Sequence, residues 1–94
     1  MFHGFRGTHH GLEKIVESLP EYRFIVPDMP GFGEAKRMRK THTIHNYADL
    51  MVEFVDAIDI SNLILLGHSM GASVLAAMLA GHPELTTKAI MINP

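Results

Sequence analysis

A chain of 94 residues, 47% of them hydrophobic, is long enough for one small domain with a limited core. Ten acidic against eight basic residues give a net charge of −2, which argues against nucleic acid or a membrane surface as partner. Cysteine is absent, no signal peptide is recognisable, and the apolar tracts fall far short of the roughly 20 residues of a membrane span. We therefore expect a cytoplasmic protein.

The first half of the chain alternates between extended and helical patterns. Met1-Phe2 resembles the last two residues of a strand, and because a glycine-containing loop follows at once we expect further sequence upstream. Apolar residues spaced as on one face of a helix predict a helix over 12–19, which Pro20 ends. Residues 22–26 then have the composition of a short strand.

The second half repeats this alternation. Thr43 is positioned to cap a helix that reaches Ile58, and the run Leu63–Leu66 predicts a strand that is buried on both faces. A helix over 69–81 and a strand over 88–92 follow. The order strand-helix-strand-helix-strand-helix-strand predicts an α/β fold, with a parallel sheet and helices on both of its faces.

The junction between the third strand and the third helix carries the sequence Gly67-His68-Ser69-Met70-Gly71. Gly-x-Ser-x-Gly between a strand and a helix is the pattern of a nucleophile elbow, a turn so tight that side chains at 67 and 71 would clash and the serine hydroxyl is pushed outward. The alternative is an ordinary glycine-containing turn in which Ser69 caps the helix.

Two further motifs follow predicted strands. His3-Gly4-Phe5 comes directly after Met1-Phe2, and Asp28-Met29-Pro30-Gly31-Phe32-Gly33 comes after residues 22–26. Because the carboxyl ends of parallel strands meet at one edge of the sheet, we expect both motifs to lie near Ser69.

Together the three motifs, in this order and spacing, resemble the serine-nucleophile branch of the α/β-hydrolase fold family. The resemblance covers essentially all of residues 1–94 and implies a single partial domain. Strands three to six of an eight-stranded sheet would be present, while the N-terminal strands and the part that carries the catalytic acid and histidine would be missing.

The resemblance also implies roles for individual residues. Ser69 would be the nucleophile, and the backbone amides of Phe5 and Met70 would form the oxyanion hole. The remaining motif positions would be structural: His3, Gly4, Gly67, Gly71, Asp28, Pro30, Gly31 and Gly33. His82 lies a whole helix away from Ser69 and cannot act as its base. No metal or cofactor is expected.

These expectations favour a hydrolase of carboxylic esters or related small acyl compounds that works through a serine acyl-enzyme. Without the acid and the histidine, we expect the 94-residue chain to be inactive by itself. An alternative is a ligand-binding, receptor-like member of the same fold; an unrelated small domain would leave the convergence of three motifs unexplained. We also expect self-association through exposed sheet edges.

Overall fold

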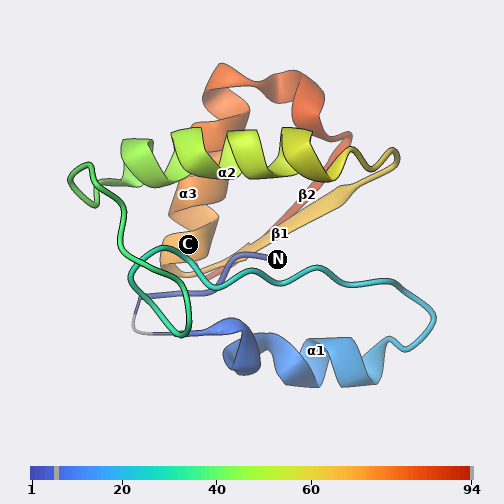
Figure 1. The fold of residues 1–94 in the computed structure, drawn as a ribbon. Helices are drawn as coiled ribbons and strands as arrows, with labels where there is room; N and C mark the ends of the chain where they lie inside the picture. Colours follow the sequence, from blue (N-terminus) through green and yellow to red (C-terminus); the bar gives the residue numbers. More distant parts are fainter. Residues whose placement is uncertain (6, 94) are drawn as a thin grey trace.

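A computed structural model describes residues 1–5 and 7–93. Within these residues a two-stranded parallel sheet pairs β1 with β2, and the register runs from Ile64 opposite Lys88 to His68 opposite Ile92. Helices α2 and α3 lie together on one side of the sheet, and α1 lies on the other (Figure 1). None of the helices in this part of the chain is long and apolar enough to cross a bilayer. The elements in chain order are η1 (His9–Leu12), α1 (Glu13–Ser18), α2 (Ile44–Ile58), β1 (Ile64–His68), α3 (Met70–Gly81), η2 (Pro83–Leu85) and β2 (Lys88–Ile92).

Helix α2 begins where the sequence predicts. The Thr43 hydroxyl oxygen accepts a hydrogen bond from the Asn46 amide at 3.1 Å, which satisfies one of the unpaired amides of the first helical turn. Along one face of α2, Tyr47, Met51 and Val55 are buried. This face packs on α3 and fixes the position of that helix over the sheet.

The core lies between α2, α3 and the loops that precede α2. Val74, Leu75 and Met78 of α3 are almost fully buried, as are Phe2 and Met29. Helix α3 also packs directly on β1, and these contacts fix the junction between the two elements, which contains Ser69.

The predicted strand over 22–26 is wrong, and with it the fully alternating order of strands and helices. These residues run beside Met1 without forming a ladder; the amine of Met1 donates a hydrogen bond to the Ile25 carbonyl at 2.8 Å. A strand needs a neighbouring strand to form hydrogen bonds with. Among the described residues, the segment beside 22–26 is Met1-Phe2, which forms a single parallel bridge, from Phe2 to Gly67.

The burial of β1 also differs from the prediction. Leu65 is 3% exposed, but Ile64 is 44% exposed, and the strand continues past Leu66 to His68. The run of apolar residues correctly indicates a strand. Its second face, with Ile64 exposed and Leu66 and His68 half-buried, is only partly covered.

Candidate active site

Ser69 occupies the sharp turn between β1 and α3. Its backbone has φ 54° and ψ −117°, a left-handed conformation that is strained for a residue with a side chain. The Ser69 side chain makes no capping hydrogen bond to α3, so the alternative in which it serves as the helix cap is wrong. The Ser69 amide donates to the Ile92 carbonyl at 2.9 Å, which fixes the turn to the end of β2.

The two glycines of the motif are required by close backbone contacts. A Cβ at position 67 would lie 2.6 Å from the carbonyl carbon of Gly71 and 2.7 Å from the Ala72 nitrogen. A Cβ at position 71 would lie 2.6 Å from the carbonyl carbon of Phe2. Real Cβ atoms do not approach backbone atoms so closely, so a side chain at either position would require the backbone to shift.

Gly4 brings the first loop against Ser69. A Cβ at position 4 would lie 3.1 Å from the Cβ of Ser69, so the loop passes directly beside this side chain. Met70 is the first residue of α3, and its amide donates to no group among the described residues. This leaves a helix N-terminal amide next to Ser69, where developing negative charge is favoured.

His3 anchors the first loop by hydrogen bonds to Gly4 and Met29 and makes none to Ser69. Its side chain is buried, and its Nε2 accepts a hydrogen bond from the Met29 amide at 2.8 Å. The proton of the neutral ring must then be on Nδ1, which donates to the Gly4 carbonyl at 2.9 Å. His3 therefore ties the loop that carries Gly4 to the loop that carries Met29.

Asp28 holds the second motif together. One of its oxygens accepts from the His9 amide and faces the His9 Nδ1 atom, both at 2.7 Å, while the other accepts from the Glu34 amide at 3.1 Å. The His9 amide is the main cause that lowers the Asp28 pKa from 3.8 to about 2, and the Glu34 amide adds to it. A Cβ at Gly33, where φ is +54°, would lie 2.6 Å from the Asp28 Cγ atom.

The other two predicted residues of this motif shape its turn. The Pro30 carbonyl accepts a hydrogen bond from the Tyr47 hydroxyl at 2.9 Å, and burial raises the pKa of this tyrosine. Gly31 has a φ of +86°, which glycine adopts without strain. Pro30 therefore ties the turn to helix α2, and Gly31 allows the chain to bend there.

The described residues provide no base for Ser69. No hydrogen bond in this part of the chain joins the Ser69 hydroxyl to a histidine. His82 lies beyond the far end of α3, which at about 1.5 Å per residue is roughly 18 Å long. It pairs instead with Glu84 at 3.3 Å, in agreement with the prediction that it is not the base.

The sequence did not point to two neighbours of the site. Phe32 packs edge-on against both His3 and Phe5, with ring centroids 5.7 Å apart in each pair. His9 meets Asp28 across 19 positions of the chain, a separation that no local pattern spans. The position of Phe32 between Gly31 and Gly33 in the second motif could have suggested an aromatic side chain near Ser69.

The Phe5 side chain is 66% exposed, although it contacts Phe32. Its amide follows Gly4, whose backbone lies against Ser69. The Phe5 ring and amide therefore belong to the loop that passes beside Ser69. Within residues 1–5 and 7–93, histidine and acidic side chains form no group of three that could hold a metal ion.

Comparison with known proteins gives a consistent result. The sequence profile of the family described as alpha/beta hydrolase fold matches residues 1–94. A Bacillus subtilis protein described as an uncharacterized hydrolase is 28% identical over 92 residues, which are 96% of this chain and 34% of that protein. Lipase 1 from Psychrobacter immobilis is 31% identical over 86 residues, 89% of this chain and 27% of the lipase.

Solved structures agree with the sequence comparisons. An N-acyl homoserine lactonase, crystallised as a mutant with N-hexanoyl homoserine, superposes with a TM-score of 0.85 at 25% identity, over 97% of this chain and 34% of that one. A marine microorganism esterase, at 23% identity and a TM-score of 0.85, shares the fold over 96% of this chain and 34% of its own. The chain spans about a third of the length of the curated relatives it matches first.

Proposed function

The chain belongs to the alpha/beta hydrolase fold family, and on that premise we propose that it carries the nucleophile and oxyanion hole of a serine hydrolase for carboxylic esters or related small acyl compounds. The observation that carries the proposal is the strained backbone of Ser69 between β1 and α3. Strain of this kind is maintained where the surrounding contacts enforce it, and it is typical of functional residues.

In the proposed reaction the Ser69 Oγ atom attacks the carbonyl carbon of the ester. The carbonyl oxygen becomes negatively charged and accepts hydrogen bonds from the amides of Met70 and Phe5. Loss of one such donor typically costs about 3–4 kcal/mol of transition-state stabilisation. The alcohol then leaves with a proton, and water releases the acid from the serine ester.

The proton must pass through a base that an acidic group orients, since a serine hydroxyl by itself is a weak nucleophile. The described residues place no histidine on Ser69. We therefore propose that the acid and the histidine lie in sequence that corresponds to the rest of the longer relatives. The names of those relatives, a hydrolase and a lipase among them, support hydrolysis as the type of reaction.

The experiment is a chimera. Residues 1–94 replace the aligned 92 residues of the Bacillus subtilis hydrolase, and p-nitrophenyl acetate is the substrate. We expect a stoichiometric burst of p-nitrophenol that Ser69→Ala abolishes. Ser73→Ala, on the exposed side of α3, is the matched control and should keep the burst. A folded chimera with the same burst in Ser69→Ala would contradict the proposal.

The isolated 94-residue polypeptide tests the other part of the proposal, that the base for Ser69 lies outside these residues. Because the described residues supply no base, we expect its ester hydrolysis to equal that of its Ser69→Ala variant. A Ser69-dependent burst from the isolated polypeptide would show that a base for Ser69 lies within it and would contradict this part of the proposal.

A further inference from the structure

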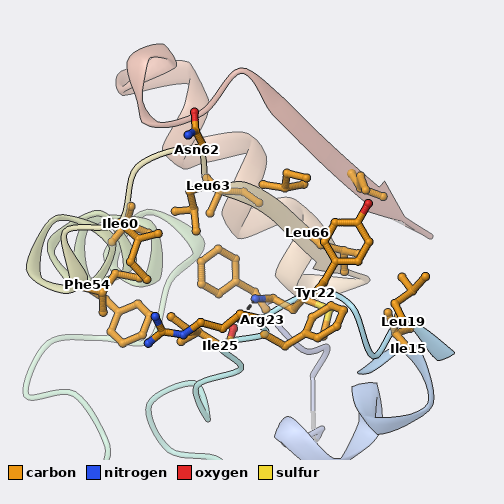
Figure 2. Close-up of a pocket in the computed structure, with 18 residues that line it drawn as sticks. Ile15, Leu19, Tyr22, Arg23, Ile25, Phe54, Ile60, Asn62, Leu63 and Leu66 are labelled. Carbon is orange, nitrogen blue, oxygen red and sulfur yellow. Dashed lines mark hydrogen bonds between the residues drawn. The ribbon is translucent and has the colours of Figure 1, made fainter. Parts of the chain in front are cut away.

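Cavities of opposite chemistry lie among the described residues, an apolar cavity and a cationic pocket. The apolar cavity, of about 500 Å³, has Leu63 and Leu66 on one side and Ile25 on the opposite side (Figure 2). The Met1 amine borders it, and burial lowers the pKa of this amine from 8.0 to about 6. The cationic pocket, of about 430 Å³, is lined by Arg37, Met38, Lys40, Thr41 and His42. Charge is disfavoured in the first cavity, whereas the lining of the second favours an anion.

Positive charge is concentrated in the segment that forms this pocket. Half of the eight basic residues of the chain fall within five positions, as Lys36, Arg37, Arg39 and Lys40. All four side chains are exposed. The ion pairs within residues 1–5 and 7–93 join carboxylates to histidines, and none of them includes these four cations. Like charges without a carboxylate partner repel one another, so an anion that binds among them is stabilised.

The His42 ring forms a fixed wall of the cationic pocket. Its Nε2 accepts a hydrogen bond from the Met38 amide at 2.9 Å, so the proton of the neutral ring is on Nδ1, which donates to the Tyr47 hydroxyl oxygen at 3.3 Å. The Tyr47 hydroxyl in turn donates to the Pro30 carbonyl at 2.9 Å. These bonds join the loop to helix α2 and to the second motif. The cationic side chains of the pocket take no part in them.

A series of contacts connects the cationic pocket with Ser69. A Cβ at Gly31 would lie 3.5 Å from the Cγ atom of Arg37, so the stem of this arginine packs on the turn of the second motif. The next residue, Phe32, packs edge-on against Phe5, with ring centroids 5.7 Å apart. The loop that carries Phe5 passes beside Ser69. Two aromatic rings are therefore the intermediate members of the series, and they offer an apolar surface.

We propose that the cationic pocket binds the carboxylate or phosphate group of a small anionic ligand, and that this ligand is the substrate, an acyl compound with the anionic group at the far end of its acyl chain. The substrate assignment rests on the proposed function, whereas the binding of the anion does not.

The residue types of the pocket suit an oxyanion. Arg37 carries a planar fork of N–H donors that matches two oxygens of a carboxylate or phosphate, and Lys40 adds a second positive charge. The Thr41 hydroxyl is a further donor. The apolar chain of the substrate would lie along the rings of Phe32 and Phe5, with the ester carbonyl at Ser69.

The first test is the binding of inorganic phosphate to the 94-residue polypeptide, followed by the NMR shifts of its backbone amides. We expect shifts at 37–42, with a dissociation constant of about 1 mM that rises with salt. Arg37→Gln and Lys40→Gln should each weaken binding about tenfold. Arg39→Gln and Lys36→Gln are the matched controls, because they remove the same kinds of charge from the same five positions but do not line the pocket. They should weaken binding by about twofold or less.

The second test uses the chimera with the Bacillus subtilis hydrolase. Its substrates are p-nitrophenyl monoesters of dicarboxylic acids, from glutarate to sebacate, and neutral p-nitrophenyl esters of the same chain lengths. At the chain length that reaches the pocket, we expect KM to be about tenfold lower for the anionic ester, with kcat little changed, because the pocket binds substrate and transition state alike. Arg37→Gln should remove this difference, and Arg39→Gln should keep it.

Each negative result overturns a defined part of the proposal. Amide shifts that stay unchanged up to about 10 mM phosphate would overturn the pocket, and so would equal losses in Arg37→Gln and Arg39→Gln, which would indicate diffuse attraction by the whole segment. Phosphate binding together with equal KM values for anionic and neutral esters at every length would overturn the substrate assignment. Phosphate binding by a chimera without a Ser69-dependent burst would support the pocket and contradict the proposed function.

Discussion

The two ends of strand β1 differ in how completely their surroundings define them. At its carboxyl end, Gly4 lies against the Ser69 side chain, Gly71 lies against the backbone of Phe2, and a hydrogen bond from the Ser69 amide joins the turn to β2. At its amino end, Ile64 is 44% exposed and borders an apolar cavity. The comparison teaches that contacts between distant segments define the turn at Ser69, whereas the amino end of the same strand is only partly covered.

The largest effect should come from Gly71→Ala. The new methyl group would overlap the backbone of Phe2, so we expect a loss of about 3 kcal/mol or more of the free energy of unfolding. Gly81→Ala is the control at the other end of α3, where a Cβ meets nothing within 4 Å, and it should stabilise by up to about 1 kcal/mol. Urea denaturation followed by circular dichroism measures both; equal effects would contradict the account.

The hydrogen bonds that Asp28 accepts from the His9 and Glu34 amides predict that acid lowers the stability of the folded protein. Its pKa is about 2 in the folded protein against 3.8 ordinarily, so the unfolded chain binds more protons between these values. The stabilisation is complete above about pH 4 and is lost as the pH falls toward 2. Melting temperatures from pH 5 to pH 2 should fall less steeply for Asp28→Asn, and parallel curves for the two proteins would refute this.

The Met1 amine predicts a second rise of stability with pH, at the cavity end and in a higher pH range. Its pKa is about 6 when folded and 8.0 ordinarily, so between these values the unfolded chain again binds more protons and stability rises with pH. The gain is absent at pH 6 and complete at pH 8. An N-acetylated form has no such titration, so the difference in melting temperature between the two forms should change across this range and not outside it.

The smallest effect should come from paired tyrosine substitutions. Tyr47→Phe removes the hydrogen bond to the buried Pro30 carbonyl and should cost about 1 kcal/mol. Tyr22 at the cavity end is 56% exposed, so Tyr22→Phe should change the free energy of unfolding by less than about 0.5 kcal/mol. Urea unfolding in which Tyr22→Phe loses more free energy of unfolding than Tyr47→Phe would contradict this prediction.

The same contrast explains what the sequence could predict. The helix after Ser69 and the Thr43 cap depend on neighbours within a few residues, and the structure agrees with both predictions. The turn at Ser69 is recognisable from its glycines, although the contacts that require them come in part from Phe2 and Ile92. Residues 22–26 have strand composition, but strand formation requires a partner elsewhere in the chain. The contact between His9 and Asp28 likewise joins distant positions, which spacing alone does not bring together.

Self-association through sheet edges stays a prediction. Beyond the bridge from Phe2 to Gly67, no strand among the described residues pairs with the edge of β1 opposite β2, and an edge of this kind can pair with other chains. We expect size-exclusion chromatography to detect a dimer or higher oligomer that grows with protein concentration, and a monomer at every concentration would contradict the prediction.

The most direct measurement is a crystal structure of the chimera after reaction with an alkyl phosphonate, which mimics the tetrahedral intermediate. The account predicts a bond from phosphorus to the Ser69 Oγ atom, with one phosphonyl oxygen about 2.7–3.1 Å from the amides of both Phe5 and Met70. An adduct on another residue, or a phosphonyl oxygen that contacts neither amide, would contradict it.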